Sequence, residues 1–273
     1  MASVRIVAWP IGATLLLCWH LSALSRAEDG DPAAWRATAT LAAAEAHQAA
    51  AADKRFVYAI ASRTIGRYDR QTGRPVAISS GAATHLNSGF LWRGRLYCAH
   101  SNYPERPERS EILVLDPESM ELATYHHFAE QEGSLTWAVR HEESWWCNFA
   151  FYDRENARSY LARFDGQWRE QARWSYPAEL VEKLGRYSLS GGVWYEGQLL
   201  ATDHDSPVLY HLAVPDEGDV LELVEVLKAP FAGQGIAVDP LTGGLVGVIR
   251  KEKVVVFAQR ERAAGPRALP PSR

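Results

Sequence analysis

The sequence predicts an all-β protein, a five-bladed β-propeller whose ring is closed by an N-terminal strand. Short apolar strands and tight turns recur in the same order five times, at spacings of 39, 47, 56 and 44 residues. This is close to the length that a four-stranded blade uses. The 29 aromatic residues, ten of them Trp, favour repeated small cores over a helical bundle. Residues 35–41 alternate as a strand does, and they precede the first repeat.

Each repeat begins with a polar residue at the head of a short strand. These leading residues are Gln48, Asn87, Ser134, Ser190 and Gln234. After a tight turn, second strands are expected at 56–60, 96–99, 145–148, 199–202 and 245–249. Third strands are expected at 64–68, 111–115, 160–164, 208–212 and 253–257, and four of them run into turn-forming residues.

A fourth strand is expected in the first four repeats, at 75–79, 121–128, 170–176 and 221–228. The fifth repeat lacks one, and residues 35–41 are expected to supply it, which removes an open sheet edge. The alternative is a helix over residues 37–52, whose alanine content has high helix propensity. The register with the other repeats favours strands. One short helix is expected at 178–184, directly after Pro177.

The N-terminal segment is expected to be a secretory signal. Arg5 precedes an apolar run over residues 6–24, and Ser-Arg-Ala at 25–27 fits a cleavage site. We therefore expect a signal peptide over 1–27, a single propeller domain over 28–258 and a disordered tail over 259–273. The protein would then be secreted or periplasmic. An uncleaved membrane anchor is the alternative.

The net charge and the cysteine content limit the classes of molecule that the protein is expected to bind. The formal net charge is -4, without a cluster of Lys and Arg, which argues against nucleic acid. Only Cys98 and Cys147 remain after cleavage, and we expect two buried free thiols without a zinc site. The expected partner is a small polar ligand or a peptide. We expect a monomer, with no membrane association once the signal is removed.

The propeller register predicts where the chemistry lies. The first strand of each blade lines the central channel, so the five leading residues are expected to meet at one mouth of it. Their amides and hydroxyls suit a neutral or zwitterionic small ligand. Alternatively, they only satisfy the backbone of a narrow channel.

The loops after the second strands return to the same mouth and carry titratable groups. An imidazole oriented by a carboxylate is a general base near neutral pH. The expected catalytic residues are His100, His204 and Asp203. The expected ligand-binding residues are Gln48, His85, Asn87, Asn102, Ser134, Asn148, Ser190, Asp205 and Gln234. The cofactor is unknown, and a divalent metal held by the two aspartates is one option. Alternatively, these residues cap loops and link blades.

Several of these segments resemble the plant-type glutaminyl cyclotransferases, which are secreted five-bladed propellers. The resemblance lies in Asn-Ser-Gly-Phe at 87–90, Gly-Arg-Leu-Tyr at 94–97, Glu-Ile-Leu-Val-Leu-Asp at 111–116 and Phe-Ala-Gly-Gln-Gly-Ile at 231–236. Exported propellers of the quinoprotein-like type share these motifs. In the cyclotransferase family a functional Glu directly follows the Leu-Tyr of a second strand, and here that position is Cys98.

Two functions remain open on the sequence. In the first, the mouth is an active site of cyclotransferase or hydrolase type that acts on an N-terminal glutamine, an amide or a lactone. In the second, the propeller binds a peptide, a glycan or an envelope protein without turnover. Convergence of His85, His100 and His204 in one concave site would favour the first function.

Overall fold

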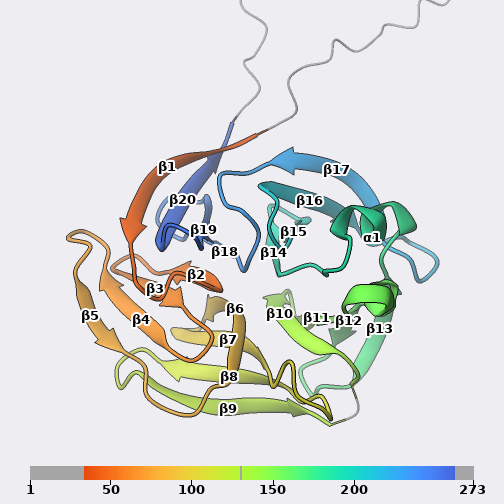
Figure 1. Cartoon of the computed structure of the whole chain (residues 1–273), viewed down its shortest axis with the longest axis horizontal. Helices are drawn as coiled ribbons and strands as arrows, with labels where there is room; N and C mark the ends of the chain where they lie inside the picture. Colours follow the sequence, from red (N-terminus) through yellow and green to blue (C-terminus); the bar gives the residue numbers. More distant parts are fainter. Residues whose placement is uncertain (1–33, 130, 262–273) are drawn as a thin grey trace, which may run out of the picture. The chain divides into compact units, whose positions relative to one another are not determined.

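Five repeats of apolar strands and tight turns fold into five four-stranded antiparallel sheets arranged in a ring (Figure 1). The computed structural model describes residues 34–129 and 131–261. The chain divides into two units, Met1–Gly30 and Asp31–Arg273, and the account below concerns the second. The expected signal segment lies outside the described residues, and so does the expected tail over 259–273 apart from residues 259–261. The predicted five-bladed propeller is confirmed.

Each of the first four blades runs in chain order from the innermost to the outermost strand. Blade 1 contains β2 (Ala49–Ala52), β3 (Phe56–Ile60), β4 (Ile65–Asp69) and β5 (Pro75–Ile78). Blade 2 contains β6 (His85–Trp92), β7 (Arg95–Ser101), β8 (Ser110–Asp116) and β9 (Glu121–Phe128). Blade 3 contains β10 (Ser134–His141), β11 (Ser144–Ala150), β12 (Tyr160–Phe164) and β13 (Glu170–Ser175). Blade 4 contains β14 (Gly191–Tyr195), β15 (Gln198–Thr202), β16 (Val208–Ala213) and β17 (Glu222–Lys228).

The fifth blade joins the two ends of the described chain. It contains β18 (Ala237–Val238), β19 (Leu245–Ile249), β20 (Val254–Arg260) and β1 (Trp35–Ala42). β1 pairs antiparallel with β20, from Trp35 opposite Arg260 to Ala42 opposite Val254, as the sequence predicted. Trp35 and Arg36 of β1 pair with Arg260 and Gln259. Because of these pairs, β20 continues two residues beyond the expected domain end at residue 258.

The alanine-rich segment over residues 37–52 forms β1 and β2 rather than a helix. Crowding at the axis explains why small residues occupy the inner strands. A Cβ added at Gly235 would lie 2.6 Å from the Cβ of Ala49 and 2.8 Å from the Cα of Ser88. The Gly235 amide donates to the Gln48 carbonyl at 2.8 Å, which links blades 5 and 1. Tertiary packing therefore overrides helix propensity here.

Apolar clusters between neighbouring blades form the core. Trp137 and Trp145 are its largest fully buried side chains. One buried ion pair also joins blades: Arg70 donates to both carboxylate oxygens of Asp239, each at 2.6 Å. Burial alone would raise the pKa of Asp239, but the hydrogen bonds from Arg70 and Thr242 lower it overall.

Two short helices lie in the described residues. α1 (Ala178–Leu184) follows Pro177, as the sequence predicted. The 3-10 helix η1 (Asp153–Arg158) was not expected, because its polar sequence has no apolar periodicity and no buried residue. None of the helices in residues 34–129 and 131–261 has the length and apolar character needed to cross a membrane.

Candidate functional site

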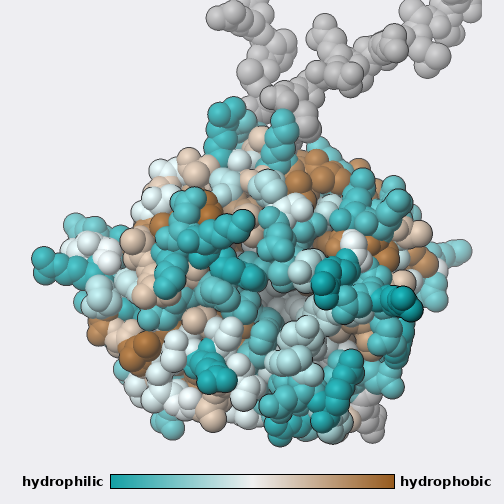
Figure 2. All heavy atoms as spheres, in the orientation of Figure 1, coloured by the Kyte–Doolittle hydropathy of each residue, from teal (hydrophilic) through white to brown (hydrophobic). Residues whose placement is uncertain are grey.

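One mouth of the channel holds a cavity of about 170 Å³, which we call the polar mouth. Its lining residues come from strand heads and from the loops after second strands: Gln48, His85, Asn87, Tyr103, Tyr152, Asp153, Arg186, Tyr187, Ser190, His204, Gln234 and Arg250. Hydrophilic residues surround the hollow at the centre of the face shown in Figure 2. The structure thus brings four of the five leading residues to one cavity.

Three amide side chains form the floor of the polar mouth, and each is anchored. Gln48 donates to the Ser62 hydroxyl at 3.0 Å, and Asn87 donates to the Leu135 carbonyl at 2.8 Å. Gln234 donates to the His204 carbonyl at 2.7 Å. All three are 9% exposed or less. These contacts hold the amides in fixed orientations before any ligand arrives.

Gln234 also adopts an uncommon backbone conformation, with a φ of 69°. A left-handed conformation at a residue other than glycine requires surrounding contacts that hold it. Here the Thr202 hydroxyl donates to the Gln234 carbonyl at 2.6 Å, and the side chain is fixed by His204. Local strain is therefore located at the cavity itself.

An imidazole and a carboxylate meet at the rim. His204 Nδ1 lies 2.9 Å from Asp205 Oδ2, and the imidazole stacks on Tyr187 with ring centroids 3.9 Å apart. The side chain of Asp205 is 67% exposed. The stacking holds the plane of the imidazole, and the carboxylate lies close to Nδ1, which has no partner with hydrogen-bond geometry among the described residues. An imidazole beside a carboxylate is the pair that a general base uses.

The polar mouth disfavours protonation of its other histidine. The pKa of His85 is lowered by burial and by the neighbouring positive charges, among them Arg250. Tyr103 packs its edge against His85 with ring centroids 5.7 Å apart. Burial also raises the pKa of Tyr152 well above its ordinary value. His85 and Tyr152 therefore present neutral hydrogen-bonding groups at neutral pH.

Arg250 contributes a cation to the polar mouth. Its Nε donates to the His47 carbonyl at 3.2 Å, the one hydrogen bond that the described residues give this guanidinium. Burial lowers the pKa of Arg250, and the charge of Asp205 opposes this shift. Arg186, by contrast, pairs with Asp153 at 2.8 Å. The Nη atoms of Arg250 are thus the cationic donors left for a ligand.

Two expected catalytic residues have other roles. His100 lies outside the cavity lining, where its Nε2 accepts from the Thr84 amide at 3.0 Å and its Nδ1 lies 3.2 Å from Glu111. Asp203 accepts from the amides of residues 205 and 206 at 3.0 Å and from Tyr210 at 2.9 Å. This is a turn and not an extended strand, so the carboxylate beside His204 belongs to Asp205 and not to Asp203.

Four expected ligand-binding residues also lie outside the cavity lining: Asp205, which lies at the rim beside His204, and Asn102, Asn148 and Ser134. Asn102 bridges its own loop, bonding the Pro107 carbonyl and the Arg109 amide. Asn148 is fully buried and accepts from Tyr176 at 2.5 Å. Ser134 is 1% exposed and lies beside Tyr152. The last three residues link loops and blades, which is the alternative role that the sequence left open.

The described residues assemble no group of three or more His, Cys, Asp or Glu side chains that could hold a metal ion. The expected pair of Asp203 and Asp205 does not form a chelate, because the Asp203 oxygens already accept three hydrogen bonds.

Six lining residues are not among the expected site residues. Tyr103, Tyr152, Asp153 and Arg250 follow second strands, so the loop rule that pointed to His204 applies equally to them. Arg186 and Tyr187 lie between α1 and the leading residue Ser190, and their nearness to Ser190 along the chain is the signal that could have found them. The Asp153 amide donates to the Arg186 carbonyl at 2.7 Å, which holds this segment beside η1.

Comparison with known proteins supports the fold. No known family profile matches this sequence, and no curated protein matches it. Among solved structures, the chain is similar to Myxococcus xanthus glutaminyl cyclase, with a TM-score of 0.56 and 10% sequence identity, over 84% of this chain and 97% of that one. A chain of the mitotic checkpoint complex aligns with a TM-score of 0.42 and 9% identity, over 77% of this chain and 62% of that one. The chain is therefore a propeller of glutaminyl-cyclase-like fold.

Cys98 occupies the position at which the sequence resemblance expects a functional Glu. It is fully buried, and desolvation raises the pKa of its thiol well above the ordinary value. Cys98 and Cys147 are both free thiols. The polar mouth thus has its carboxylates at the rim, on Asp205 and Asp153, and none on the second strand of blade 2.

Proposed function

We propose that this chain binds a small polar ligand that carries a carboxylate or carboxamide group in the polar mouth. The observation that carries the proposal is the convergence of hydrogen-bonding side chains from four blades, together with Arg250, on one cavity of about 170 Å³. The residues involved are Gln48, His85, Asn87, Ser190, His204 and Gln234. A cavity of this size suits a small ligand, since the pockets that hold drug-sized ligands measure about 300–1,000 Å³.

The donors and acceptors favour a ligand of amino-acid type. Anchored amides discriminate by hydrogen bonding because a ligand that leaves them unpaired loses affinity. The Arg250 guanidinium can bind a carboxylate through two parallel hydrogen bonds. The phenols of Tyr103 and Tyr187 add apolar ring faces to the wall.

Calorimetric titration tests the binding proposal, with L-pyroglutamate and its carboxamide as matched probes. The unchanged protein is expected to prefer the carboxylate. Arg250→Met should weaken pyroglutamate binding about 10-fold or more, because a charge-assisted contact is lost. Arg74→Met is the matched control, since Arg74 is exposed on blade 1, outside the cavity lining. Absence of binding by both probes would contradict the proposal. Equal affinity of both probes, or binding unaffected by Arg250→Met, would contradict the role given to Arg250.

A second candidate function is catalysis of cyclotransferase or hydrolase type. The contact of 2.9 Å between His204 and Asp205 favours it, because an oriented imidazole can move a proton. In the cyclisation of an N-terminal glutamine, the α-amine attacks the side-chain amide carbon, the carbon–nitrogen bond to the leaving group breaks, and ammonia departs with the transferred proton. Cys98 weakens this candidate, since the family's carboxylate is missing at its position.

Ammonia release from a glutaminyl dipeptide tests the catalytic candidate. His204→Gln should lower turnover about 100-fold, the usual contribution of positioned proton transfer. His211→Gln is the control, because His211 lies on β16 outside the cavity lining. No turnover above the uncatalysed rate, or equal losses in both variants, leaves binding as the function.

We also propose that the working protein is exported. The support is the charged, apolar and small-residue pattern over residues 1–27. Mass spectrometry of protein recovered from the periplasm or the medium should give an N-terminus at Glu28. Recovery of the full-length chain from the membrane fraction would favour the uncleaved anchor instead.

A further inference from the structure

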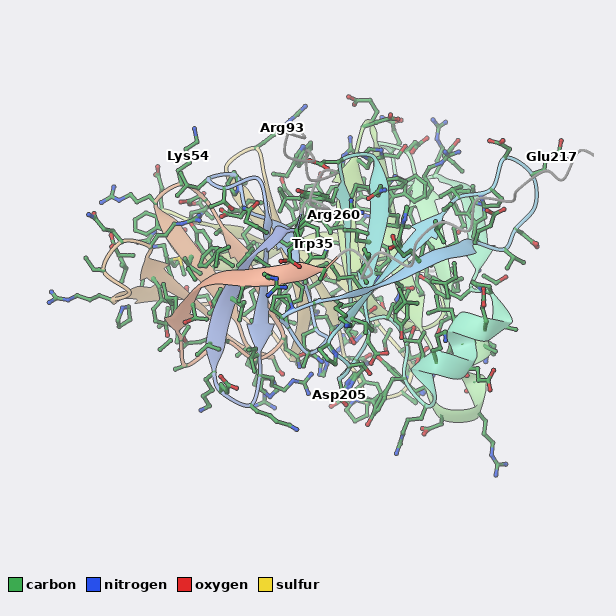
Figure 3. The ribbon with its side chains drawn as sticks, turned by 90° about the horizontal axis from the view of Figure 1, so that it is seen from above. Trp35, Lys54, Arg93, Asp205, Glu217 and Arg260 are labelled. Atoms are coloured by element: carbon green, nitrogen blue, oxygen red, sulfur yellow. The ribbon has the colours of Figure 1, made fainter. Side chains whose placement is uncertain are left out.

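The opposite mouth of the channel holds a second cavity, of about 440 Å³, which we call the aromatic mouth. All five blades contribute to it: Asp53, Trp92, Arg140, Trp194 and Pro240 are among its lining residues. In Figure 3, Lys54 and Arg93 project from one face of the propeller and Asp205 from the other. Since Arg93 lines the aromatic mouth and Asp205 pairs with His204 of the polar mouth, the two cavities open on opposite faces.

The walls of the aromatic mouth come from the C-terminal ends of the innermost strands of the blades. Trp92 ends β6, and Trp194 lies one residue before the end of β14. Val139 and Val193 add aliphatic surface. Apolar walls with two indoles suit the flat apolar body of a ligand, which gains free energy when its surface leaves water.

Arg140 is the unusual residue in this apolar setting. Its side chain is only 9% exposed, and its Nε has no hydrogen-bond partner among the described residues. The Nη2 atom of Arg140 lies 3.7 Å from the carboxylate of Glu143, whose side chain is 98% exposed. The rings of Trp92 and Trp145 lie 5.1 and 5.3 Å from its guanidinium carbon. The cation is thus desolvated without a close anionic partner.

A nearby arginine shows what a complete pair looks like in this fold. Arg70 is also largely buried, and Asp239 neutralises it with two hydrogen bonds of 2.6 Å. The indole rings and the distant Glu143 carboxylate compensate the charge of Arg140 only in part, so a ligand anion would be favoured beside it. The other charged lining residues are Arg93 and Asp53. Asp53 already accepts from two backbone amides and from Tyr58.

We propose that the aromatic mouth is a second ligand site, which takes an aromatic carboxylate. The ring of the ligand contacts the indoles of Trp92 and Trp194 in the cavity wall, and its carboxylate pairs with Arg140. The site is independent of the polar mouth, because no residue lines both cavities.

Calorimetric titration with 2-naphthoate and its neutral analogue 2-naphthamide tests this proposal. The unchanged protein should bind the carboxylate about 10-fold more tightly than the amide. Arg140→Met should abolish this preference and leave the affinity for the amide unchanged. Arg250→Met, at the polar mouth, should preserve the preference. Arg140→Gln replaces the Met variant if the latter does not fold.

Three results would overturn the proposal. The first is equal affinity for the two probes, or no binding of either probe at millimolar concentration, in the unchanged protein. The second is a carboxylate preference that survives the loss of Arg140. The third is a preference lost with Arg250→Met, which would place the naphthoate in the polar mouth instead.

Discussion

The polar mouth and the aromatic mouth are the two ends of one ring, and the chain builds them in different ways. Long loops after second strands, together with η1 and α1, supply the polar mouth. Tight turns with positive φ, such as Arg93 at 49° and Gly94 at 75°, close the aromatic mouth. Short turns place strand-end side chains directly in a cavity, whereas loops bring residues that no strand pattern indicates.

The arginines at the two mouths differ in the same way. Arg250 faces a cavity whose other groups are polar, and Asp205 lies close enough to affect its pKa. Arg140 lies among aromatic rings. Among the described residues, the carboxylate paired with its guanidinium is that of Glu143, with 3.7 Å between Nη2 and the carboxylate oxygen. Charge alone therefore does not define a site, since the dielectric surroundings decide what a cation can do.

The largest expected effect concerns the completed pair beside the aromatic mouth. Asp239→Ala leaves Arg70 buried without a partner, so the free energy of unfolding should fall by about 3–5 kcal/mol. Urea unfolding at pH 7 measures it. Because the folded pKa of Asp239 is lowered, its stabilisation is complete above pH 3.8 and is lost as the pH falls below that value. Glu118→Ala, on the surface, is the control, and equal stabilities of the two variants would contradict the prediction.

The second-largest expected effect is a difference in stability between variants of the two aspartates that flank His204. Asp203→Ala removes three hydrogen bonds of a buried turn and should lower the free energy of unfolding by about 1–3 kcal/mol. Asp205→Ala should change it by less than about 0.5 kcal/mol, because the side chain is 67% exposed. Thermal unfolding of both variants checks the order. A larger loss for Asp205 would reverse the assigned roles.

Arg140 should behave unlike Arg70. Arg140→Met removes a desolvated charge and keeps much of the side-chain volume, so the free energy of unfolding should be unchanged or higher by up to about 2 kcal/mol. Arg70→Met leaves the buried Asp239 carboxylate without its cationic partner and should destabilise the protein. Denaturant unfolding of both variants without ligand measures the contrast. A comparable loss for both would mean that Arg140 is paired in solution.

The smallest expected effect is a difference in pH response. The pKa of His85 is lowered in the folded protein, so below pH 6.5 the unfolded chain binds more protons and stability falls toward the folded pKa. His85→Gln should reduce the loss of stability between pH 7 and 5. Arg140→Met should show the same loss of stability between pH 7 and 5 as the unchanged protein, since no histidine lines the described part of the aromatic mouth. Identical pH profiles for His85→Gln and the unchanged protein would contradict this.

The sequence predicted the polar mouth in part and did not predict the aromatic mouth. Reading every loop after a second strand would have added Arg250 and Tyr152 to the polar mouth, because their position in the repeat is the same as that of His204. The same rule also pointed to His100, whose imidazole is instead held by Thr84 and Glu111 within blade 2. Repeat position determines the face of the propeller on which a residue lies, but not which neighbour its side chain meets.

The sequence by itself determined the five blades, the closing strand and the helix at Ala178–Leu184, because periodicity, turns and helix starts are local signals. Only the tertiary structure decided that Asp205 and not Asp203 lies beside His204, and that Arg140 is buried without a close anion. The Asp203 carboxylate is held by hydrogen bonds within residues 203–210, whereas His204 is positioned by the distant residues Tyr187 and Gln234. The surroundings of Arg140 depend on Trp92, from another blade, and on exclusion of water. The local pattern around His204 or Arg140 does not encode these contacts with distant segments.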